Sequence, residues 1–224
     1  MEDVSELVRN IEKISGKAGQ SIWTTFTKFL DVSLEATQKV KVWDMQWEPE
    51  LGVFEKARQD FYEGYAILLR NMYELTYQDV IGSAYMQINI ANKRAGQFFT
   101  PWNIAKMMAE MIIGEPDLKT YTPQRPMTIC DPCVGSGILL LAAASVLPRS
   151  FIDEGRVLFY GMDIDETCVK MACLNASLYG LDRPSGFVKP TQELTEKEIQ
   201  RIPEPYKTQV QQTLFDLGEG KKAA

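Results

Sequence analysis

The stretch DPCVGSG, residues 131–137, lies between a short apolar run at residues 127–130 and an apolar stretch at residues 138–146. This pattern predicts a strand, a glycine-rich turn and a helix, the arrangement with which doubly wound folds build a nucleotide pocket. The glycines would let the backbone approach a ligand closely, and Asp131 at the strand end would accept hydrogen bonds from ligand amines or hydroxyls. The segment therefore predicts an α/β fold with a ligand site at this turn.

A second strand and a second acid follow after one strand–helix–strand unit. Residues 157–162 form an apolar run that ends at Asp163, and a helical pattern then extends to Gly180. A third, short strand is expected near residues 187–188. The alternation of strands and helices predicts a parallel sheet in which Asp131 and Asp163 close neighbouring strands.

The acid that ends the second strand is the group that usually holds a ribose diol in such folds. The turn at residues 131–137 matches neither Gly-x-Gly-x-x-Gly nor a phosphate loop that ends in Gly-Lys-Ser/Thr, which disfavours a dinucleotide and a triphosphate. The turn and the acid together therefore predict an adenosine-type cofactor site. The alternative is a structural glycine turn beside a surface aspartate.

Residues 1–90 predict a helical region that precedes the sheet. Apolar residues recur there at intervals of three and four, as in Val4, Leu7, Val8 and Ile11. The aromatic residues of this region could stack on nucleic-acid bases, but we favour a role in the helical core. They are Trp23, Phe26, Phe29, Trp43, Trp47, Tyr62, Tyr73 and Tyr77.

Another helix is expected to begin at Thr100 and Pro101, since threonine suits the N-cap and proline suits the first helical turn. Large apolar residues at helical spacing form its apolar stripe. They are Ile104, Met107, Met108, Met111 and Ile112.

Composition and charge limit the classes of function. The 224 residues are 45% hydrophobic and 24% charged, as in an ordinary globular protein. No apolar run is long enough for a membrane span, and the first residues lack a signal-peptide pattern, so we expect a cytoplasmic location. The net charge of −6 is unusual for a protein that binds DNA unaided. Lys39, Lys41, Lys93 and Arg94 could contact phosphates, although ordinary surface charge is the simpler interpretation.

The absence of histidine and the spacing of the four cysteines bear on catalysis and metal binding. Without histidine the chain cannot build a histidine triad, base or metal ligand. Cys130 and Cys133 have the spacing of a redox or zinc pair, but Cys168 and Cys173 lie five positions apart in an expected helix and would face different directions. We therefore interpret the cysteines as small buried residues and expect no metal.

Three segments carry a resemblance to a known family: GQFFTP at residues 96–101, the turn at residues 131–137, and YGMDID at residues 160–165. In this order they resemble the adenine-specific DNA methyltransferases, most closely the modification subunits of type I restriction systems, over residues 91–182. The resemblance implies an α/β fold with a truncated Rossmann-like, S-adenosylmethionine-dependent methyltransferase core at residues 91–224, behind an N-terminal all-helical region at residues 1–90.

The resemblance also implies a cofactor site for S-adenosylmethionine. Phe99 and Thr100 would line its methionine end, Asp131 and the backbone of the glycine turn would hold the amino-acid portion, and Asp163 would hold the ribose hydroxyls. The adenine would meet Ile164, with Thr191 or Gln192 as its polar contact. The full predicted set is Phe99, Thr100, Asp131, Pro132, Gly135, Gly137, Asp163 and Ile164.

The sequence departs from the family downstream of this site. Members carry an Asn-Pro-Pro-Tyr/Phe motif that holds the adenine amino group and stacks on the flipped base, and no Asn-Pro-Pro occurs in this chain. Glu204-Pro205-Tyr206 could be a degenerate remnant, with Tyr206 as the stacking residue. The catalytic residues are therefore left unassigned. Residues 213–217 could add a fourth strand beside the first; otherwise the N-terminal helices or an obligate partner should cover the sheet edge.

Two functions are compatible with these features. The chain could be a methyltransferase component that binds S-adenosylmethionine and acts on DNA with the help of another subunit, within a restriction–modification, phage or mobile-element system. Alternatively, it is a catalytically inactive methyltransferase-fold module with a regulatory or assembly role. A third hypothesis is methylation of a substrate other than DNA. The intact turn favours cofactor binding, while the missing motif argues against activity of the isolated chain.

Overall fold

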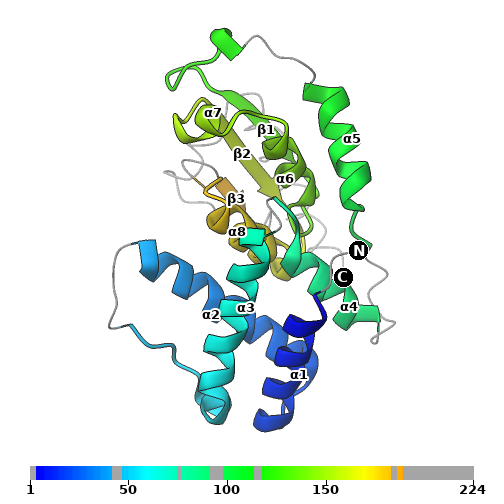
Figure 1. Cartoon of the computed structure of the whole chain (residues 1–224), viewed down its shortest axis with the longest axis vertical. Helices are drawn as coiled ribbons and strands as arrows, with labels where there is room; N and C mark the ends of the chain where they lie inside the picture. The colour runs from blue at the N-terminus through cyan, green and yellow to red at the C-terminus, as the bar shows by residue number, and fades with distance from the viewer. Residues whose placement is uncertain are drawn as a thin grey trace, which may run out of the picture.

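The computed structural model shows a helical region and a parallel α/β region packed against each other (Figure 1). It describes residues 4–41, 47–74, 77–90, 98–113, 118–182 and 186–188. In this part of the chain, no helix is long and apolar enough to cross a membrane.

The first region consists of helices, as the sequence predicts. They are α1 (Ser5–Ala18), α2 (Ile22–Lys41), the 3-10 helix η1 (Gly52–Ala57), α3 (Arg58–Glu74) and α4 (Val80–Ile90). In α1 the apolar residues at helical spacing, such as Leu7 and Ile11, are fully buried. Gly19 ends this helix in the left-handed conformation, which costs glycine less than any other residue.

The aromatic residues of this region divide between core and surface. Phe26 and Phe29 are completely buried, which confirms their predicted role in the helical core. Trp23, Tyr62 and Tyr73 are 38%, 41% and 88% exposed, so the core assignment is wrong for these three. Periodicity alone could not separate them, because each lies on a helix that buries only one face. Trp43 lies outside the described residues.

Within the residues that the structure describes, the second region is a three-stranded sheet with helical connections, which confirms the predicted α/β class. Strands β1 (Met127–Asp131), β2 (Val157–Met162) and β3 (Gly186–Val188) are parallel and lie in the order β1-β2-β3. The connections contain α6 (Ile138–Ser145), α7 (Arg149–Asp153) and α8 (Glu166–Leu178), and the 3-10 helix η2 (Leu118–Thr120) precedes β1. Asp131 pairs with Gly161, so the strand ends that carry Asp131 and Asp163 lie side by side.

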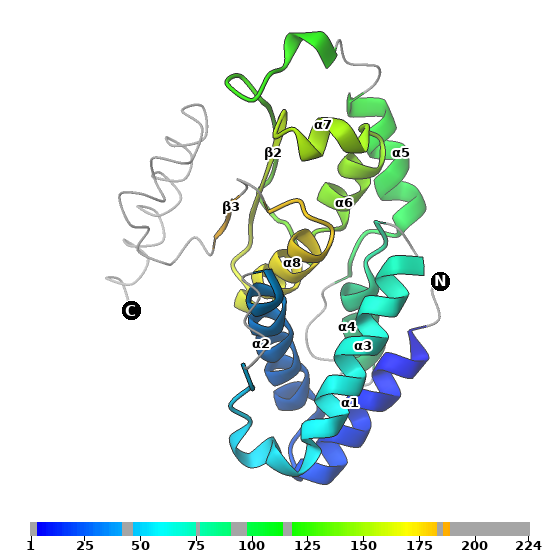
Figure 2. The same ribbon diagram turned by 60° about the vertical axis from the view of Figure 1, so that its left-hand side comes forward.

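The helices of this region cover one face of the sheet, and Figure 2 shows α6, α7 and α8 on the same side of β2. Val157 and Phe159 on β2 face this layer and are buried, whereas Leu158, on the opposite face, is partly exposed. Among the described residues, β1 pairs only with β2 and is an edge strand. The N-terminal helices α2 and α4 contact α8. The fourth strand expected at residues 213–217 lies outside the described residues.

Helix α5 (Trp102–Ile113) differs from its prediction in two respects. It begins after Pro101, so Thr100 precedes the cap position by one residue, a shift within the usual uncertainty of helix ends. Its buried residues are Ala105 and Ala109, which pack against Ala142 of α6. The predicted apolar stripe lies instead on the exposed face, because two small alanines allow a closer approach of the helices than the large side chains would. The stripe residues Ile104, Met107, Met108, Met111 and Ile112 are between 36% and 79% exposed.

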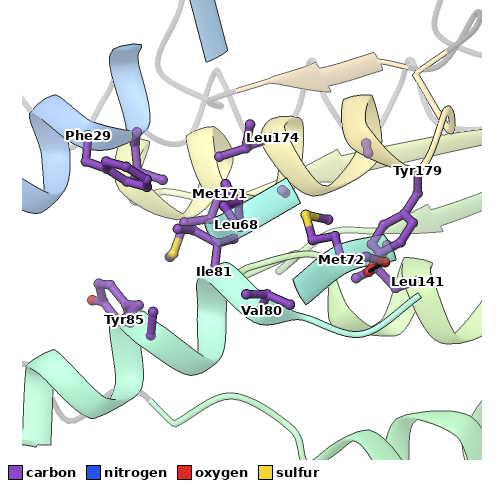
Figure 3. Packing of buried hydrophobic residues seen from close by; sticks show 14 of the residues in the cluster. Phe29, Leu68, Met72, Val80, Ile81, Tyr85, Leu141, Met171, Leu174 and Tyr179 are labelled. Atoms are coloured by element: carbon purple, nitrogen blue, oxygen red, sulfur yellow. Dashed lines mark hydrogen bonds between the residues drawn. The ribbon is translucent and has the colours of Figure 1, made fainter. Parts of the chain in front are cut away.

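The two regions share one hydrophobic core that extends from Val4 to Leu181. Figure 3 shows how they meet: Ile81 of α4, Leu68 of α3 and Met171 of α8 point toward one another. All three are completely buried. Helix α4 therefore packs against α1, α2 and α3 of the helical region and also against α8 of the sheet region. The predicted domain boundary at residue 90 stays a prediction.

The cysteines are less buried than we expected. All four thiols are free, and only Cys168 is buried, while Cys130 and Cys173 are partly exposed and Cys133 is exposed. Cys133 is exposed because it lies in the turn after β1, outside the packed face of the sheet. No group of three or more cysteine or acidic residues among those described could hold a metal ion.

Candidate cofactor site

Asp131 presents a buried carboxylate oxygen without a partner. The residue is 8% exposed at the end of β1, and its Oδ1 accepts a hydrogen bond from the Cys133 amide at 3.0 Å. Its Oδ2 is buried and has no hydrogen-bond partner among the described residues. Burial raises the pKa of this carboxyl, and the nearby Asp163 adds to the effect. A buried acceptor that lacks a donor is costly, so this oxygen is suited to a ligand amine or hydroxyl.

The glycine turn adopts a conformation that requires glycine at two positions. Gly135 and Gly137 have φ angles of +52° and +93°. The turn is held to the next strand by a hydrogen bond of 2.8 Å from the Val134 amide to the Met162 carbonyl. A Cβ atom on Gly137 would lie 3.4 Å from Ala172 of α8, an ordinary contact, so the left-handed φ and not a lack of space calls for glycine here.

Asp163 ties the turn to the end of β2. Its Oδ2 accepts from the Gly135 amide at 2.9 Å, and its Oδ1 accepts from the Asp165 amide at 2.9 Å. Asp165 in turn caps α8, because its side chain accepts from the Thr167 amide at 2.8 Å. Each oxygen of Asp163 uses one of its acceptor positions within the protein and can accept once more from a ligand.

Phe99 lies directly against the glycine turn. A Cβ atom on Gly135 would lie 3.1 Å from its ring, so the residue before Thr100 forms one wall of the turn. The Phe99 ring also stacks with Tyr85 of α4, at 5.4 Å between ring centroids. This pair brings the segment before α5 and the helical region to the same point as the turn.

The predicted site residues are placed as follows. Phe99 lies against Gly135, whose amide donates to Asp163, and Asp131 lies at the end of the neighbouring strand. Gly135 and Gly137 donate their amides to Asp163 and to Val134 within the protein.

The remaining predicted residues lie around the turn. Thr100 is partly exposed at the entry to α5, and Pro132 and Ile164 are exposed, Ile164 by 74%. Thr191, Gln192 and Tyr206, suggested for the adenine and the base, lie outside the described residues.

A polar network beneath the turn was not predicted. Asp79, immediately before α4, is 3% exposed and accepts hydrogen bonds from Ser136 Oγ, from Asn175 Nδ2 at 2.8 Å and from the Gly82 amide at 2.8 Å. Burial raises the pKa of this carboxyl. An aspartate before an apolar run indicates a helix N-cap. Nothing in the local sequence indicates that its carboxylate reaches residues so far along the chain.

The charge of the site limits the ligands that it suits. Asp131, Asp163 and Asp165 lie at one edge of the sheet, so a phosphate group would meet repulsion there. A ligand with an ammonium group or a diol would be favoured, since carboxylates accept from both. This is consistent with the predicted adenosine-type cofactor and with the sequence pattern that disfavours dinucleotides and triphosphates.

Sequence comparisons identify a family. The family model described as N-6 DNA Methylase matches residues 76–212, more than half of the chain. The methylase subunit of the type I restriction enzyme MpnII from Mycoplasma pneumoniae is 30% identical over 128 residues, which cover 55% of this chain and 22% of that protein. The corresponding HindI subunit from Haemophilus influenzae is 26% identical over 114 residues, covering 49% of this chain and 24% of that one. The chain thus aligns with about a quarter of the length of these relatives.

Two solved structures show partial likeness. A class I S-adenosylmethionine-dependent methyltransferase from Listeria monocytogenes has a TM-score of 0.47 at 15% identity, over 83% of this chain and 52% of that chain. The methyltransferase subunit of a type I restriction–modification system from Streptococcus thermophilus has a TM-score of 0.36 at 23% identity, over 66% of this chain and 31% of that chain.

Proposed function

Because the chain belongs to the N-6 DNA methylase family, we propose that it binds S-adenosylmethionine, the cofactor predicted from its motifs, at the turn between β1 and α6. The observation that carries this proposal is Oδ2 of Asp131, which has no hydrogen-bond partner among the described residues. It lies beside the carboxylate of Asp163, whose two oxygens each accept one hydrogen bond from the backbone. Asp131 would accept from the ammonium group of the methionine portion, and Asp163 would accept from the ribose hydroxyls.

The described residues fit such a ligand. A cationic group at Asp131 would offset the burial that raises the pKa of its carboxyl, and would supply the missing donor. Phe99 would limit the position of the methionine end, because its ring abuts Gly135. Ile164 is exposed next to Asp163 and is available to the adenine. When bound, the cofactor supplies a methyl group on a sulfonium centre, and the residues of this chain bind and orient it.

The same proposal assigns base recognition to another chain or another part of the system. No Asn-Pro-Pro motif occurs in the sequence, and the net charge is −6, so both the hydrogen bonding of an adenine amino group and much of the DNA affinity need another source. The relatives are subunits of type I restriction enzymes by name, which supports a partner subunit and a restriction–modification context. A phage or mobile-element origin and a cytoplasmic location belong to the proposal as well.

The alternative is a catalytically inactive member that retains the cofactor site for regulation or assembly. The missing motif favours it for the isolated chain. The two versions share cofactor binding and differ in methyl transfer, so they can be separated experimentally.

Isothermal titration calorimetry tests the shared part. Wild-type protein should bind S-adenosylmethionine, and Asp163→Ala should lose most of the affinity. Asp153→Ala serves as the matched control, since Asp153 is an exposed aspartate on α7 that pairs with Arg149. An absence of binding by the folded wild type would overturn the proposal. Transfer of labelled methyl groups to DNA by the purified chain alone would overturn the inactive alternative.

A further inference from the structure

Asp79 connects three segments that are distant in the sequence. Its carboxylate accepts from the amide of Gly82 in α4, from the hydroxyl of Ser136 in the glycine turn and from the side-chain amide of Asn175 in α8. Asn175 Nδ2 also donates to the Ser136 carbonyl at 2.8 Å. Ser136 is thus held through both its side chain and its backbone, and it is completely buried.

This arrangement exceeds what a helix cap requires. An exposed aspartate can cap α4 by accepting from the Gly82 amide alone. Here the second carboxylate oxygen points to Ser136, and no lysine or arginine among the described residues pairs with the buried charge. Burial without a cation is costly for a carboxylate. The cost is offset only because Ser136, Asn175 and Gly82 all supply donors.

Gly82 shows that α4 and the turn approach closely. A Cβ atom there would lie 2.6 Å from Cβ of Ser136 and would also collide with the Asp79 carboxylate. Any larger residue would force helix and turn apart. The absence of a side chain at this position therefore serves the contact between Asp79 and the turn.

A second contact joins the same helix to the turn. Tyr85, 1% exposed, stacks on Phe99, and Phe99 abuts Gly135. Burial raises the pKa of Tyr85 to about 12, and the nearby Cys168, Asp165 and Asp163 add to this effect. Helix α4 thus approaches Ser136 directly at Gly82 and is linked to Gly135 through Phe99.

We propose that Asp79 is a positioning residue for the cofactor site: it holds the glycine turn, through Ser136, in the conformation that binds the ligand. The turn is fixed on one side by Asp163, which accepts from Gly135, and on the other by Asp79 and Asn175. Cofactor affinity then depends on how the helical region is docked, although α4 supplies no ligand contact. This inference rests on the proposed function, in which the turn binds S-adenosylmethionine.

The test compares variants by calorimetry with S-adenosylmethionine and by hydrogen exchange without it. Asp79→Leu should lower the affinity about tenfold, because Ser136 loses its anchor while the size of the side chain is kept. Asp79→Asn should stay within about twofold, because its Oδ1 can accept as before and its amide can donate to the Ser136 hydroxyl. In the free protein, Asp79→Leu should also speed exchange of the Gly135 and Gly137 amides.

Asp60→Asn is the matched control, since Asp60 is a buried aspartate of the helical region, bound to Lys13 and Lys17. It should change stability without changing affinity or turn exchange. Should Asp79→Leu fail to fold, Ser136→Ala removes the same hydrogen bond from the other side and should give the same changes at reduced size.

The outcomes are distinct. If folded Asp79→Leu binds the cofactor as the wild type does, with unchanged exchange at Gly135 and Gly137, the positioning role is wrong. Equal losses in Asp79→Leu and Asp60→Asn would show a general loss of stability and would also overturn it. If the wild type does not bind S-adenosylmethionine, the proposed function fails, and the exchange experiment still decides whether Asp79 orders the turn.

Discussion

The helical region and the candidate cofactor site both contain buried aspartates, but among the described residues only the helical region pairs its aspartate with lysines. In the helical region Asp60 lies against Lys13 at 2.7 Å and Lys17 at 2.6 Å. Although burial opposes it, the hydrogen bonds from these lysines hold the pKa of Asp60 below its usual value. At the end of β1 and beneath the glycine turn, burial raises the pKa of Asp131 and of Asp79, and no cation among the described residues offsets it.

The packing of the two regions differs in the same way. The helical region is filled with large side chains such as Phe29 and Phe61, whose rings stack 6.3 Å apart. The candidate cofactor site is built around the glycine turn, in which Gly135 and Gly137 adopt left-handed conformations. In the helical region the buried polar atoms without a partner among the described residues belong to the neutral side chains of Asn10, Ser33 and Asn71, whereas at the end of β1 the atom is a carboxylate oxygen of Asp131. This difference favours Asp131 as the contact for a ligand that carries a hydrogen-bond donor. It also predicts that protein stability and ligand affinity respond to different substitutions.

The largest effect is expected in the helical region. Phe61→Ala should lower the free energy of unfolding by about 3–5 kcal/mol, because Phe61 is 1% exposed and its removal leaves a cavity. Tyr73→Ala is the control, since Tyr73 is 88% exposed and should change stability by less than about 0.5 kcal/mol. Urea unfolding measures both. Equal effects of the two substitutions would contradict the described helical core.

Asp131→Asn should lower the affinity for S-adenosylmethionine by about 2 kcal/mol, roughly thirtyfold, because it weakens a buried, charge-assisted contact. The protein itself should fold normally, since the amide oxygen of the substituted side chain can still accept from the Cys133 amide. Asp60→Asn should leave affinity unchanged. Calorimetry on both variants tests the contrast directly, and a reversed pattern would show that the region with paired charges is the functional one.

A pair of glycine substitutions compares the backbones of the two regions. Gly135→Ala should cost about 1–2 kcal/mol of stability, because φ is +52° and the new Cβ would crowd Phe99 at 3.1 Å. Gly16→Ala in α1 should instead stabilise by about 0.5–1 kcal/mol, since a Cβ there meets nothing within 4 Å and alanine favours the helix. Thermal or urea unfolding of the two variants measures the expected loss of stability in the first and the expected gain in the second. Destabilisation by Gly16→Ala would be the unexpected result.

The smallest effect concerns pH. Because the pKa of Asp79 is raised in the folded protein, its protonated form is favoured there, and stability falls as pH rises from the unfolded value near 3.8 through the folded value. Asp79→Asn cannot ionise. Relative to wild type it should therefore gain stability over this range, and the difference should level off above the folded pKa. Urea unfolding at several pH values measures it. A constant difference across the range would mean that Asp79 does not titrate on its own.

Local patterns predicted the sheet region well, because its signals lie close together in the chain. The apolar run at residues 157–162 coincides with β2, and the turn with its two glycines lies where we expected it. The exposed face of α5 was not predictable in this way. Periodicity identifies a stripe of large apolar residues, but packing favoured Ala105 and Ala109, which let α5 approach α6 more closely.

The sequence predicted the candidate site residues that lie at the glycine turn. It did not predict Asp79, which holds the turn from beneath. Asp131 and Asp163 follow apolar runs, which makes them visible in the sequence. Asp79 looks like an ordinary helix cap, and its role depends on donors that only the tertiary structure brings near. The exposed aromatic residues Trp23, Tyr62 and Tyr73 were misplaced for a related reason, since helical spacing does not state which neighbour a face will meet.

The Asp79 network has a consequence for how the pocket comes into being during synthesis. Its hydrogen bonds join residues 57 and 96 positions apart, so the turn cannot acquire its final support until α8 has been made and closed onto α4. Closing such long loops costs conformational entropy, and the hydrogen bonds offset this cost only after the loops have closed. A fragment that starts after residue 90 would contain the whole glycine turn and yet lack Asp79. Shortened versions of this chain should therefore be cut before residue 76, where the family match also begins.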